Sequence, residues 1–330
     1  MIALPPPYAD IYAIVVLLCV IPTYCLYGII AYLVFLSPHR RYYQGPFYKM
    51  FVVATGIAFI LTVGIYFQGH VLGAPIFLPF VESLPHTGFL PTFFLCFLYY
   101  GIYAGQLINC ALSFNRFSII ILKQSYHIFW NKYFRYLIFG ILTTPILLVW
   151  QFIISNVRIY IFDDNNESMG YHLMDFDPPK WANKGKVMIG IYAVTAILSI
   201  IMNSVTLVFL VKNSNITKNK SSDKNDDSSP NNIRFFICIM MSFVAESMTA
   251  VIQGLMNVIR YGTCTNPYLY TLQVLVSEFA TLGPPWYLFL MSDELRRDMM
   301  GTIRGQAISK VNVTQSRMFT VVSERQRSTL

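Results

Sequence analysis

Two carboxylic acids, Glu246 and Glu278, lie inside long apolar stretches of the sequence. Neither stretch contains a Lys or Arg that could pair with its acid. A carboxyl in a low-dielectric interior favours its protonated form, in which it can also donate a hydrogen bond. Three roles therefore remain open for these residues: joining two helices, binding an ion or proton, and contacting a ligand.

A second group of polar side chains repeats at helical spacing. Tyr99, Tyr103 and Gln106 are four and three residues apart, so they share one face of a helix. Similar polar faces are predicted on three later apolar stretches. Such faces line a ligand site in one interpretation, and simply join helices in the other. The candidates for ligand contact are Tyr99, Tyr103, Gln106, Tyr192, Gln253 and Gln273.

A third group could transmit a signal. Arg116 is predicted at the inner end of the longest apolar stretch; it keeps its charge and must find acceptors or water. The alternative is that it only orients the helix by extending to the lipid headgroups. Pro284 and Pro285 should kink their helix, as fixed shape or as a hinge. The candidate switch comprises Asn115, Arg116, Glu246, Glu278, Pro284 and Pro285.

The elements that carry these residues are predicted to be transmembrane helices. The composition is 55% hydrophobic and 12% charged, far from a soluble domain. Seven stretches approach or exceed the roughly 20 apolar residues that cross a bilayer. The sequence thus predicts an all-α membrane protein, a seven-transmembrane helix bundle over residues 11–291. The predicted spans are 11–36, 47–68, 88–122, 134–154, 187–211, 235–258 and 268–291.

Basic residues predict the orientation of the bundle. With residues 1–10 outside, 19 of the 24 Lys and Arg fall in cytoplasmic segments. This arrangement predicts a multi-pass plasma-membrane protein with a flexible third cytoplasmic loop at 212–234. Residues 292–330 form the cytoplasmic tail, which begins with a short amphipathic helix at about 292–304. Ser292 is its expected N-cap, and its apolar face should lie on the inner leaflet.

Several functional classes are not supported. No zinc, P-loop or dinucleotide motif is present, and the predicted spans contain no His or Asp that could build a catalytic site, so we expect neither a metal, a cofactor nor an enzyme. The net charge of +8 flanks apolar spans, which argues against nucleic-acid binding.

Two short sequences suggest modification and binding. Asn166 begins the one glycosylation sequon on the predicted outside, and 328–330 fits the ending that PDZ domains accept.

Short motifs distributed along the chain give it a resemblance to a known family. The motifs are Ile21-Pro22-Thr23-Tyr24, Pro46-Phe47-Tyr48, Asn115-Arg116-Phe117, Ile128-Phe129-Trp130, Ser277-Glu278, Pro284-Pro285 and Leu295-Arg296. In this order the chain resembles the nematode serpentine chemoreceptors of the Srg superfamily, in the Srv or Srg class, over about residues 11–300.

This resemblance implies a G-protein-coupled-type receptor that detects small molecules in sensory-neuron membranes. Arg116 would match the arginine of the Asp/Glu-Arg-Tyr triplet in larger receptor families. Asn115 stands where the acid would be, and the Asn-Pro-x-x-Tyr motif is missing.

The competing hypothesis is an ion- or proton-coupled transporter or channel that uses Glu246 and Glu278. Such proteins often carry internal repeats and broken helices at mid-membrane, and the sequence shows neither clearly.

Overall fold

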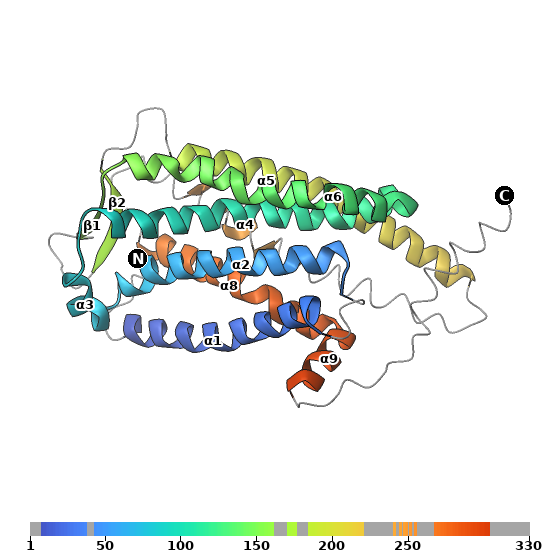
Figure 1. The fold of residues 1–330 in the computed structure, drawn as a ribbon, viewed down its shortest axis with the longest axis horizontal. Coiled ribbons are helices and arrows are strands. Elements are labelled where there is room, and N and C mark those ends of the chain that lie inside the picture. The colour runs from blue at the N-terminus through green and yellow to red at the C-terminus, as the bar shows by residue number, and fades with distance from the viewer. Residues whose placement is uncertain are drawn as a thin grey trace.

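The computed structural model describes residues 8–37, 43–161, 170–176, 184–220, several positions between 240 and 255, and 267–303. Long helices run side by side through this part of the chain, as the sequence predicted (Figure 1). The principal helices are α1 (Tyr8–Phe35), α2 (Pro46–Tyr66), α3 (Leu78–Glu82), α4 (Phe89–Leu122), α5 (Tyr126–Ile154), α6 (Lys184–Lys220), α8 (Pro267–Met291) and α9 (Asp293–Ile303).

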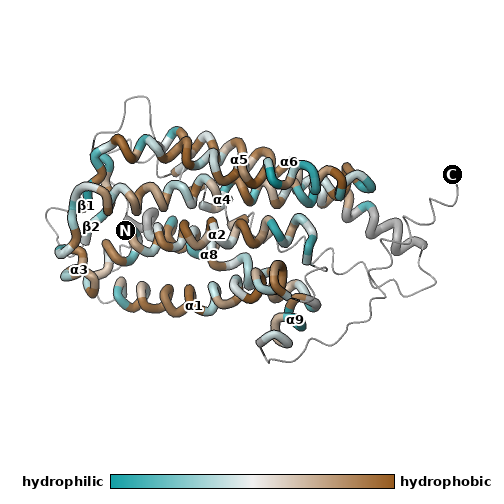
Figure 2. The backbone as a smooth tube through the Cα atoms, in the orientation of Figure 1, coloured by the Kyte–Doolittle hydropathy of each residue, from teal (hydrophilic) through white to brown (hydrophobic). Residues whose placement is uncertain are grey.

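Five helical runs in the described residues are long and apolar enough to cross a membrane: 8–35, 46–71, 89–154, 185–209 and 271–291. Figure 2 shows the apolar residues along these helices and hydrophilic residues towards their ends. The third run has 66 residues, or roughly 100 Å of helix, and so is too long for one bilayer crossing. It reverses at Lys123, whose φ is 41°, and contains two predicted spans. The predicted span 235–258 is described only in part, and its described positions are helical.

Three helices extend beyond their predicted ends. A π-helix, η1 (Phe67–Val71), continues α2, so the second membrane helix includes His70. The prediction that no span contains a histidine is therefore wrong. α5 begins at Tyr126 instead of 134, and α6 runs to Lys220. The first residues of the predicted flexible loop 212–234 are thus helical, because a helix continues past the membrane boundary that hydropathy detects.

One end of the bundle carries a β-hairpin, which the sequence predicted only as a loop. Strands β1 (Val157–Ile161) and β2 (Tyr171–Asp175) are antiparallel. The backbone N–H of Tyr171 donates to the carbonyl of Leu72 at 2.7 Å, and that of Ile159 donates to the carbonyl of His86 at 2.8 Å. The hairpin is therefore fixed to the segment after α2 and to the approach to α4. We call this the hairpin end of the bundle.

The opposite end carries α9, and we call it the α9 end. Ser292 Oγ accepts the N–H of Leu295 at 3.3 Å, which is the predicted N-cap. Leu295 and Met299 have no exposed surface and pack against α1 and α2. The prediction that this apolar face lies on the inner leaflet is wrong, because the bundle buries it. A hydrogen bond of 2.6 Å from the Tyr43 hydroxyl to Asp298 adds to this docking.

Helices α2 and α4 pack closely enough for backbone contact. A Cβ added at Gly101 would lie 2.7 Å from Leu61 Cα, and one added at Gly64 would lie 2.7 Å from Leu98 Cα. The two glycines lie on facing helices, each opposite a leucine of the other. Small residues are the usual means of bringing membrane helices this close.

Candidate functional site

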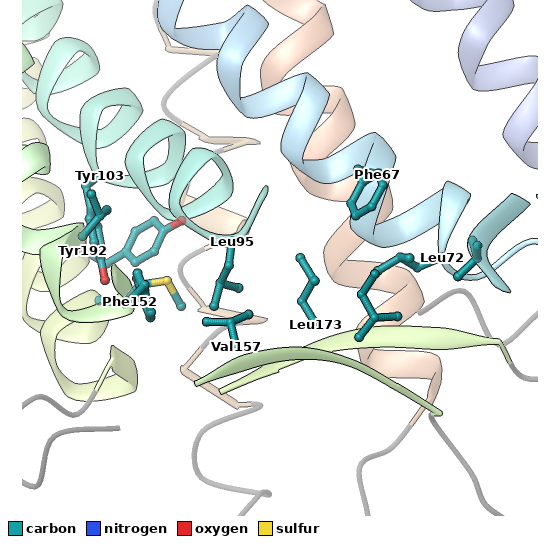
Figure 3. Close-up of a cluster of buried hydrophobic side chains, with 12 residues drawn as sticks. Phe67, Leu72, Leu95, Tyr103, Phe152, Val157, Leu173 and Tyr192 are labelled. Atoms are coloured by element: carbon teal, nitrogen blue, oxygen red, sulfur yellow. The ribbon is translucent and has the colours of Figure 1, made fainter. Parts of the chain in front are cut away.

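An aromatic cluster lies near the hairpin end between α4, α5 and α6, and we call it the tyrosine cluster. It consists of Tyr99, Tyr103, Phe152 and Tyr192, which share one hydrophobic core cluster. The ring centres of Tyr99 and Tyr103 are 6.0 Å apart, and those of Tyr99 and Phe152 are 4.7 Å apart. These separations are typical of favourable aromatic pairs. Figure 3 shows Tyr103, Tyr192 and Phe152 gathered on one side of this core.

The polar atoms of the tyrosine cluster are unevenly satisfied. Gln106 Oε1 and Thr195 Oγ1 are 3.4 Å apart, one helical turn beyond Tyr103 on α4. Tyr103 has no exposed surface, and its hydroxyl has no hydrogen-bond partner among the described residues. Leaving a buried hydroxyl unpaired costs about 1–3 kcal/mol. A molecule that offers an acceptor or donor to Tyr103 would recover this energy.

The β-hairpin closes the tyrosine cluster from the end of the bundle. Val157 and Leu173 are buried against Leu95 and Leu72 in the same core cluster (Figure 3). None of the four residues of the tyrosine cluster belongs to the strands. The two strands together cover the cluster. Sequence reasoning missed this cover because each strand has only five residues.

Two ligand candidates remain, Gln253 and Gln273. Gln253 lies outside the described residues. Gln273 is half-buried on α8, which packs mainly against α1 and α2. The structure therefore brings together Tyr99, Tyr103, Gln106 and Tyr192, and places Gln273 elsewhere.

Glu278 joins three helices. Its Oε1 lies 2.5 Å from His70 Nε2 on η1, and its Oε2 accepts a hydrogen bond from the Tyr12 hydroxyl on α1. The His70 ring is flanked by two tyrosine rings, with centroid distances of 5.1 Å to Tyr12 and 5.0 Å to Tyr66. We call His70, Glu278 and Tyr12 the carboxylate cluster. Glu246, the other membrane acid, lies outside the described residues.

His70 is the functional candidate that sequence reasoning missed. The predicted span ended at Gln68, because three less apolar residues (68–70) follow one another there. The apolar residues Val71 and Leu72 after them were the available signal that the helix continues. The π-helix turns His70 inward, where its side chain is fully buried. Single π-turns inside helices frequently occur at functional sites.

A small cavity of about 10 Å³ lies beside the carboxylate cluster, between α1, α2 and α8. A cavity of this size holds one water molecule at most. Its lining consists of Val16, Val20, Thr62, Ile65, Tyr66, Glu278, Thr281 and Leu282.

The two prolines of α8 are bridged by α1. Pro285 has no N–H, so the carbonyl of Thr281 loses its helical partner. The Tyr27 hydroxyl donates to this carbonyl at 3.2 Å. One residue after the prolines, Trp286 Nε1 donates to Thr23 Oγ1 at 3.0 Å. This part of α8 is therefore held by α1 on both sides of the prolines.

Near the α9 end, Asn115 binds α5. Asn115 Nδ2 donates to the Tyr126 hydroxyl at 2.9 Å, and the backbone carbonyl of Asn115 accepts from Ser118 Oγ at 2.7 Å. Ser118 Oγ in turn accepts from the Trp130 indole at 2.9 Å. All four residues are buried. Asn115 thus ties α4 to the start of α5.

Arg116 contacts a different helix from its neighbour Asn115. Its guanidinium carbon lies 4.2 Å from the centre of the Phe47 ring, which is a cation–π contact. Phe47 also packs in the core cluster that contains Leu295 and Met299 of α9. Arg116 is therefore positioned by the start of α2, at the end of the bundle where α9 docks.

Comparison with known proteins assigns the chain to a family. The model of the "Srg family chemoreceptor" family matches residues 13–299, which contain the tyrosine cluster, His70, Glu278 and Arg116. The chain belongs to the Srg chemoreceptor family. It is 22% identical to serpentine receptor class gamma-2 of Caenorhabditis elegans over 86% of this chain and 82% of the relative. It is 20% identical to serpentine receptor class gamma-3 of the same organism, over 88% and 84%.

Membership of the Srg family confirms the resemblance drawn from the short motifs. The Srg chain is a multi-pass helical membrane protein. Its family is one of chemoreceptors, which are generally not enzymes. Within the described residues, no three His, Cys, Asp or Glu side chains gather as a metal site would require. Asn166 and the C-terminal 328–330 lie outside the described residues, so glycosylation and a PDZ partner stay predictions.

Proposed function

We propose that this Srg receptor binds a small molecule at the tyrosine cluster and signals to the opposite end of the bundle. The observation that supports this most is the buried Tyr103 hydroxyl without a partner among the described residues. Aromatic rings pack in the same cluster, and the amide of Gln106 lies one helical turn away on α4; apolar rings with a few polar groups are typical of small-molecule sites. Membership of a chemoreceptor family supports the same role.

The receptor is proposed to lie in the plasma membrane with residues 1–10 and the hairpin end outside. The excess of Lys and Arg in the predicted cytoplasmic segments supports this orientation. The α9 end then faces the cytoplasm, and the tyrosine cluster lies on the side from which an environmental molecule arrives. Expression in sensory neurons is proposed from the family alone.

Inward signalling is proposed to pass through a heterotrimeric G protein that contacts Arg116. Asn115 is bound to Tyr126 and supplies no negative charge, so a resting lock of the arginine–carboxylate kind is absent at this pair. Arg116 instead stacks on Phe47. When the α9 end opens, the guanidinium can reach backbone carbonyls of an inserted partner helix, which is a shift between two helix arrangements.

The binding site is tested with Tyr103→Phe, once a panel of small molecules has given an active compound. Removing the hydroxyl should lower the potency of a compound that hydrogen-bonds to it by about tenfold, the loss expected for one buried hydrogen bond. Dose–response curves for cells with matched surface levels measure the change. The ring remains, so folding should be preserved.

Tyr100→Phe is the matched control. Tyr100 also packs against this core cluster, but its hydroxyl already donates to the carbonyl of Leu142 on α5 at 3.2 Å. Its loss should leave potency unchanged. Equal potency for wild type and Tyr103→Phe with every active compound would contradict a site at the tyrosine cluster.

A further inference from the structure

The carboxylate cluster connects the hairpin-end half of α8 to two other helices. Glu278 binds His70 of η1 at 2.5 Å and accepts a hydrogen bond from Tyr12 of α1. His70 has no exposed side-chain surface, and that of Glu278 is 11% exposed. Hydrogen bonds in a low-dielectric interior are stronger than the same bonds in water. These contacts are thus a concentrated polar attachment of α8 in its first half.

A separate attachment holds α8 at its prolines. Tyr27 donates to the Thr281 carbonyl that Pro285 leaves without a partner, and Trp286 donates to Thr23. Beyond this point Leu288 is fully buried and packs with residues of α1 and α9. The α9-end half of α8 is therefore fixed by α1 and α9, independently of Glu278.

Between the two attachments the backbone of α8 is weakened. Two consecutive prolines remove two helical hydrogen bonds, and helix kinks of this kind are usual hinge positions. Only one turn separates Glu278 from Thr281, so the carboxylate cluster is the polar attachment next to the kink. On the same half of α8, Val274 packs with Ile65 and Leu98 and faces Gly69.

We propose that His70, Glu278 and Tyr12 form a latch that holds the first half of α8 against α1 and η1, and that this half turns about the segment 281–285 when the latch opens. Tyr27 holds the Thr281 carbonyl at this pivot. The other half of α8 stays in place, because Trp286 binds Thr23 and the buried Leu288 packs with residues of α1 and α9. The receptor thereby contains a movable arm at the hairpin end and a fixed segment at the α9 end.

The movement is tested by distances between spin labels in purified protein in lipid nanodiscs, with the six native cysteines replaced. One label pair joins Ile76 to Leu272 and reports on the arm; the other joins Phe35 to Leu290 and reports on the fixed half. All four side chains are exposed, at 54%, 44%, 52% and 58%. Because no ligand is added, the result does not depend on small-molecule binding at the tyrosine cluster.

Glu278→Leu removes both acceptors of the latch. We expect a second, displaced distance for the Ile76–Leu272 pair, with the ratio of displaced to latched molecules raised about tenfold or more, as expected for losing two buried hydrogen bonds. The Phe35–Leu290 distance should stay unchanged. Tyr12→Phe removes one of the two hydrogen bonds, and it should raise the same ratio by a smaller factor.

Tyr66→Phe is the matched control for Tyr12→Phe. Tyr66 also stacks on His70, but its hydroxyl donates to the carbonyl of Ala13 and not to Glu278. Its distances should equal those of wild type. An unchanged Ile76–Leu272 distance in Tyr12→Phe would overturn the latch, even if Glu278→Leu fails to fold. Equal displacement of both label pairs in Glu278→Leu would overturn the hinge.

Discussion

Gly101→Ala is expected to remove most of the receptor from the cell surface. The new methyl would lie 2.7 Å from both Cα and Cβ of Leu61, a distance that real side chains do not adopt. Because the obstacle is backbone, α2 and α4 must separate along their whole contact. Overpacking of this kind costs about 1–3 kcal/mol, and Gly64→Ala should add a comparable loss. Surface labelling and thermal stability in detergent measure both changes.

Gly105→Ala is the control on the same helix. An added Cβ there would meet no atom within 4 Å, and alanine favours helix over glycine. Surface level and stability should be unchanged or slightly higher. If Gly101→Ala behaves like Gly105→Ala, the close approach of α2 and α4 is wrong.

Arg116→Ala is expected to keep surface expression and ligand binding, and to lose most inward signalling. Alanine removes the stacking on Phe47, which is worth about 0.5–2 kcal/mol, too little to unfold a membrane bundle. It also removes every donor that a cytoplasmic partner could bind, so messenger output should fall about tenfold or more. Arg116→Lys keeps the charge without the planar donor array, and should keep part of the output.

Surface level, ligand binding and messenger output must be measured on the same cells. A guanidinium that merely extends to the headgroups predicts normal output from both variants. Normal output from Arg116→Ala would therefore contradict a signalling role, and loss of surface expression would indicate a structural one.

The helices could be predicted because the membrane leaves one strong pattern in the sequence. Apolar runs of sufficient length placed α1, α2, α4 and α8 to within a few residues. The ends were less predictable, since helical hydrogen bonding continues where hydropathy falls. Because hydropathy falls at Gln68, the predicted span ended there and left out His70. The burial of His70 depends on contacts with Tyr12 and Glu278, which are far away in the sequence.

The tyrosine cluster could be predicted in part for a related reason. The spacing of Tyr99, Tyr103 and Gln106 placed them on one face of one helix, and α4 indeed brings them together. Which helix faces them is a property of the packing: the fold brings Tyr192 of α6 into the same core cluster, whereas Gln273 lies on α8, which packs against α1, α2 and α9 among the described elements. The β-hairpin over the cluster could not be predicted, because its two strands are too short to show a clear alternation of apolar and polar residues in the sequence.

Simultaneous recording of second messenger and membrane current tests the central claim most directly. Cells expressing the chain are exposed to a panel of small molecules, and cells expressing Gly101→Ala serve as a background that lacks the folded receptor. We predict at least one compound that changes the messenger level in wild-type cells without a current. A compound-dependent current without a messenger response would contradict the receptor and would support the transporter or channel instead.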